Sequence, residues 1–259
     1  MTGFSIKKTF IDIWDHLFVI MLMNIPFAII IALFYLVSGY LDDNLAISFL
    51  GLVFIVCLYS LYSLFVSIKA YRYSKYEMPN SSIKDEYKKR IPHALVHFVI
   101  TALIIFLCMF GIPSYLSFNS VMTSFIAIML IWVVLYLILM MQYYYPLSLY
   151  APNDSPIMTL KRCNEFFLAN IKWSFILLLK NIVSLAISII SGMIIPGLTG
   201  ISVSRMVMTR LIIVFYEYLE ANPNETKKSV NIEDALFKEK ESVGNRSFWE
   251  MIFPWKSEQ

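Results

Sequence analysis

The chain alternates between long apolar segments and short polar connections. Because an α-helix rises about 1.5 Å per residue, segments of this length can each cross a hydrocarbon core of about 30 Å. Strands of a β-barrel would instead alternate apolar and polar residues over about ten positions. The pattern therefore predicts an all-α protein, a bundle of six transmembrane helices. The six segments, each 19 to 23 residues long, are residues 17–38, 46–67, 94–112, 121–142, 173–195 and 200–218.

Lysine and arginine residues gather in every second connection. Residues 39–45, 113–120 and 196–199 contain none, whereas residues 68–93 hold seven and residues 143–172 hold three. The positive-inside rule keeps connections rich in these residues in the cytoplasm. We therefore expect both termini to be cytoplasmic and the first segment to be retained rather than cleaved as a signal peptide. The expected location is a bacterial inner (cytoplasmic) membrane.

Composition agrees with a membrane protein and argues against soluble classes. Hydrophobic residues make up 59% of the 259 positions and charged residues only 15%, which is too apolar for an ordinary soluble domain. The net charge of +3 comes largely from basic residues that flank the apolar segments, so it favours membrane anchoring over nucleic-acid binding. Cys57 and Cys108 lie inside apolar segments, and we infer no disulfide.

A threefold repeat is predicted from the segments that precede the odd-numbered spans. Each has apolar residues at helical spacing and charges on its other face, which is typical of a helix at the membrane interface. Ser82, and Ser155 followed by Pro156, are typical helix starts for the second and third copies. We predict three units, each an interfacial helix followed by a membrane hairpin. The apolar stripes are Ile6, Phe10, Ile13 and Leu17; Ile83, Tyr87, Ile91 and Leu95; and Ile157, Leu160, Phe167 and Ile171.

The composition changes after residue 219. This change divides the chain into a six-span membrane domain, residues 1–219, and a predicted mobile cytoplasmic tail, residues 220–259, in which residues 231–243 can form a helix. Aromatic side chains near its end either return to the membrane interface, the interpretation we favour because Trp and Phe partition there, or dock a protein partner. These interface or partner anchors are Phe248, Trp249, Phe253 and Trp255.

Three cations lie inside the last two apolar segments, where the sequence has no acidic residue at a comparable depth: Lys180, Arg205 and Arg210. Each Lys or Arg near the membrane centre costs about 2.5 to 3.5 kcal/mol on an insertion scale. Lys180 and Arg210 stand about 10 and 12 Å from the inner ends of their helices, whereas Arg205 stands about 8 Å from the outer end. A site should therefore be sought in this hairpin.

We predict an anion- or lipid-binding site open to the cytoplasmic leaflet, in which Lys180 and Arg210 hold a phosphate and nearby amides and hydroxyls add hydrogen bonds. Arg205 need not share that site. In the alternative, these long side chains reach the nearer membrane surface, Arg210 toward Glu217 and Arg205 outward, or another subunit supplies an acid. The candidate residues are Lys180, Arg210, Arg205, Asn24, Asn181 and Ser184.

Other polar groups give weaker signals. His93 and His97 share one helical face, but no third ligand accompanies them, so we expect packing and no metal site. Tyr143, Tyr144 and Tyr145 end a span and are interpreted as an interfacial aromatic belt. The sequence shows no phosphate-binding glycine loop, no nucleophile elbow and no pair of intramembrane carboxylates, so it predicts neither an enzyme nor a cofactor.

One stretch carries a family resemblance: Tyr145-Pro146-Leu147, Ser155-Pro156, residues 159–167 and Trp173-Ser174-Phe175. It resembles bacterial polytopic membrane proteins related to the membrane domain fused to some glycerophosphodiester phosphodiesterases, and more distantly the YesL-like proteins. In that group a proline ends one span and an interfacial helix leads into the next. Cys163 stands where serine is common. The resemblance covers residues 143–195 and implies a multi-pass membrane protein, without the phosphodiesterase domain that carries the group's activity.

These features together predict a non-enzymatic membrane protein that binds an anionic lipid or solute, or serves as an accessory or assembly subunit of a membrane complex. Its expected partners are membrane lipids, anionic ones among them, and a protein contacted by the tail; nucleic acid is not expected. The alternative is a secondary transporter or channel for a small anion. The absence of a deep Asp or Glu weakens coupling to protons or sodium ions.

Overall fold

The computed structural model describes residues 1–39, 45–75, 82–118, 120–191, 197–223, 230 and 232–243. Within these ranges the regular elements are all helices. Six helical stretches are long and apolar enough to cross a membrane, which confirms an all-helical protein with six candidate spans. The spans are Leu17–Val37, Ser48–Ser74, Ile83–Ser117, Val121–Tyr150, Ile171–Ile190 and Gly197–Ala221.

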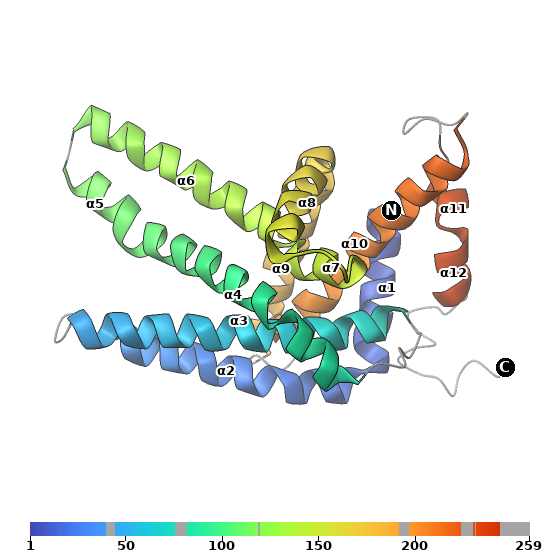
Figure 1. The fold of residues 1–259 in the computed structure, drawn as a ribbon, viewed down its shortest axis with the longest axis horizontal. Helices are drawn as coiled ribbons and strands as arrows, with labels where there is room; N and C mark the ends of the chain where they lie inside the picture. Colours follow the sequence, from blue (N-terminus) through green and yellow to red (C-terminus); the bar gives the residue numbers. More distant parts are fainter. Residues whose placement is uncertain are drawn as a thin grey trace.

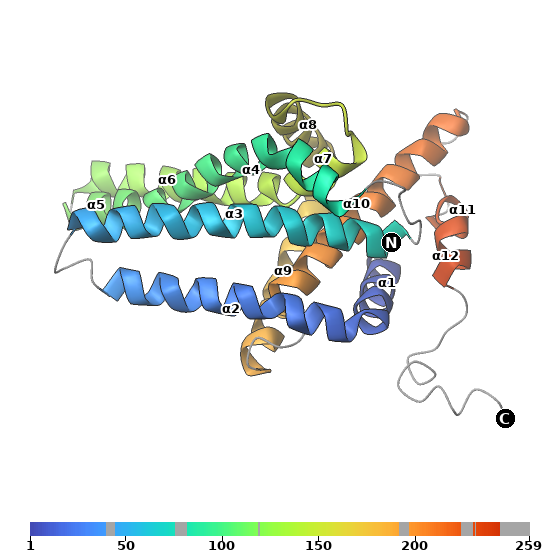
Figure 2. The ribbon, with the colours of Figure 1, turned by 60° about the horizontal axis from the view of Figure 1, so that its bottom comes forward.

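The first hairpin consists of α2 (Leu17–Gly39) and α3 (Leu45–Lys75), and α1 (Thr2–Asp15) precedes it. The helix is interrupted at His16, and α1 lies across the start of α2 in both views (Figures 1 and 2). The His16 ring stacks on Tyr73 of α3 with centroids 4.0 Å apart, which holds this corner against the longer helix. The interfacial helix predicted at the N-terminus is therefore a separate element.

The second hairpin differs from the first because its leading segment is continuous with its span. α4 (Ile83–Phe106) begins at Ser82, whose hydroxyl accepts a hydrogen bond from the Lys84 backbone N–H at 3.3 Å, and continues past Pro92 without a break. A π-helical turn, η1 (Leu107–Gly111), and α5 (Ile112–Ser117) extend it, and α6 (Val121–Met141) returns. Helix therefore occupies most of the stretch predicted to be a connection after residue 112.

A short helix, α7 (Tyr144–Tyr150), packs in the interior after α6. Tyr143, Tyr144 and Tyr145 are 0%, 0% and 3% exposed, so their interpretation as an interfacial belt is wrong. The chain turns inward at this point, because Arg90 of α4 donates a hydrogen bond to the Ser148 carbonyl and buries α7 beneath α4. Tertiary packing decides this placement; a run of tyrosines after an apolar span is equally compatible with an interface.

The third hairpin consists of α8 (Pro156–Ala169), α9 (Ile171–Ile190) and α10 (Gly197–Ala221), with a break at Asn170. Both views show α10 running obliquely to α2 and α3 (Figures 1 and 2). Gly197 has φ 61°, and a Cβ there would collide with the Asn24 side chain, so glycine alone fits. The start of α10 therefore lies beside the first third of α2, far from the end of α2 at Gly39.

α10 is the central helix of the fold. In its apolar stretch 67% of residues are buried, against 6% to 39% in the other five spans. It contacts α1, α2, α3, α7 and α9, and its later turns contact α11 (Ile232–Ala235). A span that carries two arginines is therefore surrounded by protein, which removes much of the cost of exposing it to lipid.

Part of the predicted tail has a place in the structure. α10 continues to Ala221, and residues 232–243 form α11 and α12 (Phe237–Val243), which pack against α10 and α1. The predicted helix over residues 231–243 thus appears as two short helices. The aromatic cluster of Phe248, Trp249, Phe253 and Trp255 lies outside the described residues.

Candidate functional site

Lys180 and Arg210 both find protein partners beside α1. The Lys180 ammonium donates hydrogen bonds to the hydroxyls of Ser5, at 2.9 Å, and Thr9, at 3.5 Å. Both hydroxyls belong to the buried polar face of α1. This face therefore supplies the hydrogen-bond acceptors for the Lys180 side chain of α9. Lys180 is thus satisfied by neutral groups of the N-terminal helix.

The Arg210 guanidinium is held by an acid from the tail. Its Nε donates to Glu239 Oε1 of α12 at 2.6 Å, and one terminal nitrogen donates to the Ser74 carbonyl at 3.3 Å. The other Glu239 oxygen lies 3.9 Å from the ammonium of Lys8, which lies 3.8 Å from Asp12. Among the described residues it is Glu239, and not the predicted Glu217, that pairs with Arg210. Burial lowers the pKa of Lys8, although Asp12 and Glu239 oppose that shift.

Arg205 has a different environment. It lines a cavity of about 210 Å³ whose wall residues come from α2, α3, α7, α9 and α10. Its Nε is buried and has no hydrogen-bond partner, and no acidic side chain pairs with it among the described residues. The side chain comes from the face of α10 that also carries Ser202, one turn away. The cavity is lined by Phe27, Tyr59, Ser63, Ser67, Tyr145, Leu178, Asn181, Ile182, Leu185, Leu198, Ile201, Ser202 and Arg205.

Asn181 presents an acceptor at the same cavity. Gln142 donates from its amide nitrogen to the carbonyls of Leu139, at 3.4 Å, and Ser174, at 3.5 Å, so its oxygen is left to accept. That oxygen accepts from the Asn181 amide nitrogen at 3.0 Å. The Asn181 Oδ1 is then directed away from Gln142 and has no partner, although the residue is 7% exposed. The cavity therefore holds an unsatisfied donor from α10 and an unsatisfied acceptor from α9.

Two tyrosines complete the wall, and the sequence did not identify them as site residues. The Tyr145 hydroxyl donates to the Ser60 carbonyl at 2.7 Å, and its ring stacks on His97 with centroids 4.5 Å apart. Tyr59 tilts against the same histidine at 6.1 Å. Tyr145-Pro146 after an apolar run was the available signal, because a proline is tolerated in the first turn of a helix and so indicates that a new helix begins there.

The two histidines have separate roles. His97 Nδ1 lies 3.1 Å from the Ser60 hydroxyl, and His93 Nε2 lies 3.3 Å from the hydroxyl of Thr159. Within the part of the chain that the structure describes, no three His, Cys, Asp or Glu side chains gather as metal ligands would. The histidine contacts are hydrogen bonds that tie α4 to α3 and α8.

The structure does not bring the six predicted site residues together in one site. Arg205 and Asn181 meet at the cavity, whereas Lys180 and Arg210 contact α1 and the tail. Asn24 positions α10, because its Oδ1 accepts the Thr199 backbone N–H at 3.1 Å. The Ser184 carbonyl accepts from the Ser188 hydroxyl at 2.8 Å, and Ser184 is not among the residues that line the cavity.

The groups that line the cavity have the chemistry that suits an anion carrying a hydroxyl group. A guanidinium supplies several N–H donors in a planar fork suited to phosphate or carboxylate, and Ser63, Ser67 and Ser202 add hydroxyls. The Asn181 oxygen would accept from the ligand's hydroxyl. No protein-family model matches the chain, and neither the curated proteins nor the solved structures include a match to it.

Proposed function

We propose that this membrane protein binds an anionic ligand, a phosphate-bearing small molecule or headgroup, at Arg205. The observation that carries the proposal is the contrast among the three cations of the last hairpin. Lys180 and Arg210 are satisfied by the protein, whereas Arg205 has no acidic partner in the described residues and lines a cavity that also carries serine hydroxyls. Burying an unpaired charge is costly, so a ligand that neutralises it offsets that cost.

The proposed role is binding without catalysis. The residues that line the cavity include serine hydroxyls but no Asp, Glu or His, the side chains that most often serve as the general base that activates such a hydroxyl. The same composition supports a binding protein, or an accessory subunit that presents its ligand, over a proton-coupled transporter. Flux of a small anion through reconstituted vesicles, lost on changing Arg205, would instead establish the transporter alternative.

The proposal includes the orientation of the chain in a bacterial inner membrane. Both termini are placed in the cytoplasm because lysine and arginine residues gather in the connections on that side. Cysteine labelling tests this in a variant without Cys57, Cys108 and Cys163. A cysteine at Ser114 should react with an impermeant reagent added outside, and one at Ser82 should react only after permeabilisation. The reverse result would overturn the orientation.

Binding is tested with purified, delipidated protein and glycerol 3-phosphate, which carries both a phosphate and hydroxyl groups. Arg205→Gln should lower the association constant at least about tenfold, because a charge-assisted hydrogen bond contributes about 1.5 to 3 kcal/mol. Lys172→Gln is the matched control, since it removes one positive charge from an exposed position of the same hairpin. Equal affinities for the wild type and Arg205→Gln would refute the proposal.

The same variant has a second expected property. In the absence of ligand, Arg205→Gln should be at least as stable as the wild type, because a neutral amide costs less to bury than an unpaired guanidinium. A melting temperature that rises or stays the same would show that Arg205 is retained for binding. A large loss of stability would indicate a structural role instead.

A further inference from the structure

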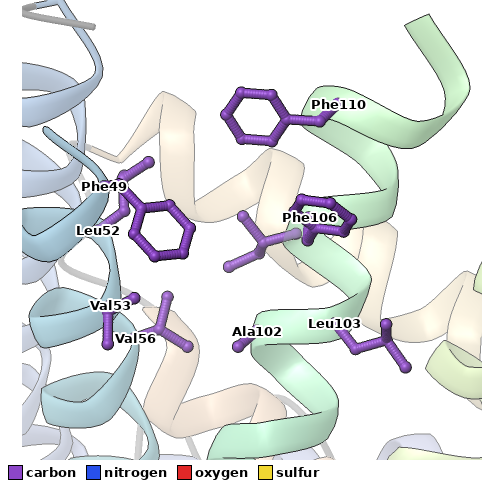
Figure 3. A pocket seen from close by; sticks show the side chains of 9 residues that line it. Phe49, Leu52, Val53, Val56, Ala102, Leu103, Phe106 and Phe110 are labelled. Carbon is purple, nitrogen blue, oxygen red and sulfur yellow. The ribbon is translucent and has the colours of Figure 1, made fainter. Parts of the chain in front are cut away.

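A second, apolar cleft opens between α3 and α4. Its volume is about 250 Å³, and Figure 3 shows Val56 of α3 and Phe106 of α4 on its two sides, with only carbon atoms among the side chains drawn. Phe106 and Phe110 border it on one side, with ring centroids 5.7 Å apart, and Phe49 stands opposite. The small side chain of Ala102 leaves the space that the cleft occupies. The lining residues are Phe49, Leu52, Val53, Val56, Ala102, Leu103, Ile105, Phe106 and Phe110.

The cleft opens at the outer surface of the helix bundle. Phe49 and Phe106 are each 50% exposed, and Figure 1 shows α4 diverging from α3 toward α5. The lining contains no charged, amide or hydroxyl side chain, so water within it would have no hydrogen-bond partner among these side chains. In a membrane, hydrocarbon chains are the abundant material that can fill such a space.

The cleft and the Arg205 cavity lie along one face of α3. Phe49, Val56 and Ser63 are spaced by seven residues, and so are Leu52 and Tyr59, which places these side chains in one stripe of the helix. The stripe is apolar over residues 49–56 and becomes polar from Tyr59 onward. The change occurs between Val56 and Tyr59, a distance of about 4.5 Å along the helix.

We propose that the ligand of the Arg205 cavity is a membrane lipid with a phosphate headgroup, and that one of its acyl chains lies in the cleft between α3 and α4. The inference rests on the proposed function at Arg205 and adds the chemical class of the ligand. A lipid matches this stripe because its charged headgroup would lie at the polar part of α3, beside Arg205. Its hydrocarbon chain would then follow the apolar part over residues 49–56. The cleft spans about 10 Å of α3, from Phe49 to Val56, so it holds part of a chain and leaves the rest in the bilayer.

The test compares two ligands that share a headgroup. Affinities of the delipidated protein in mild detergent are measured for glycerol 3-phosphate and for long-chain phosphatidic acid, by native mass spectrometry or by competition with a fluorescent analogue. The wild type should bind the long-chain lipid at least tenfold more tightly. Equal affinities would overturn the inference about the acyl chain and leave binding at Arg205 intact.

Variants that fill the cleft separate the two proposals further. Val53→Phe should reduce the long-chain preference at least fivefold and leave glycerol 3-phosphate binding unchanged, whereas Val133→Phe, the same substitution at an exposed position of α6, should change neither. Ala102→Phe provides a second block from the α4 side. If both cleft variants keep the full preference, the chain does not lie there. If Arg205→Gln leaves both ligands bound as in the wild type, the proposed function fails as well.

Discussion

The guanidinium of Arg210 on α10 lies 2.6 Å from the carboxylate of Glu239 on α12, a residue 29 positions later in the chain. This pair attaches the C-terminal segment to the central helix. Glu239 also approaches the ammonium of Lys8 on α1 at 3.9 Å, so the two ends of the chain share one carboxylate. The cluster stabilises a layer formed by α1, α12 and the later part of α10.

Replacing Glu239 with glutamine should detach that layer. The substitution leaves Arg210 and Lys8 without one of their negative charges in a place where the Glu239 side chain is 6% exposed, and breaking such a pair costs about 3 kcal/mol. Unfolding of the purified protein would measure the loss, and proteolysis of residues 232–243 should become faster. Glu241→Gln, an exposed neighbour on α12, is the control and should have little effect.

Gly197→Ala should destabilise the third hairpin. The residue has φ 61°, and its Cα faces the Asn24 side chain, which must move to admit a methyl group. We expect a loss of about 2 kcal/mol in the free energy of unfolding. Gly39→Ala serves as the comparison because a Cβ at that position meets nothing within 4 Å. If the two substitutions lower the free energy of unfolding by the same amount, Gly197 does not lie against Asn24 and α10 does not approach α2 closely there.

Gln142→Leu should weaken ligand binding, although Gln142 is not among the residues that line the cavity. Gln142 orients Asn181 by accepting from its amide nitrogen at 3.0 Å, so a leucine would leave that carboxamide free to turn. The association constant for glycerol 3-phosphate should fall about threefold, the effect of one hydrogen bond between neutral groups. A double-mutant cycle with Asn181→Leu checks the mechanism. Independent, additive losses would contradict a positioning role for Gln142.

His16 should make stability depend on pH just below neutrality. Burial lowers its pKa from the ordinary value of 6.5, and Asp15 opposes the shift only in part. The unfolded chain therefore binds a proton more readily than the folded one, and stability falls as the pH drops through 6.5 until the folded-state pKa is passed. Comparing wild type with His16→Phe isolates this contribution, since phenylalanine can keep the stacking on Tyr73. A stability difference that does not change with pH would disprove it.

The sequence alone determined the local features of this protein. Six apolar segments of sufficient length predicted six candidate spans, because a helix that crosses hydrocarbon needs about 20 predominantly apolar residues. Ser82 and Ser155 predicted two helix starts, and both side chains accept the expected backbone hydrogen bonds. Cations inside the last two apolar segments also directed attention to the last hairpin, although Lys180 and Arg210, and not Arg205, were the predicted phosphate ligands.

Tertiary structure decided which of those cations is available to a ligand. Lys180 meets Ser5 across 175 positions of sequence, and Arg210 meets an acid from the tail, whereas Arg205 is left beside a cavity. The inward turn of α7 placed Tyr145 in that cavity wall, where a belt at the interface had been predicted. Periodicity reports only which face of one helix is apolar. How the helices cross, and therefore which polar groups find partners, depends on contacts between segments far apart in the chain.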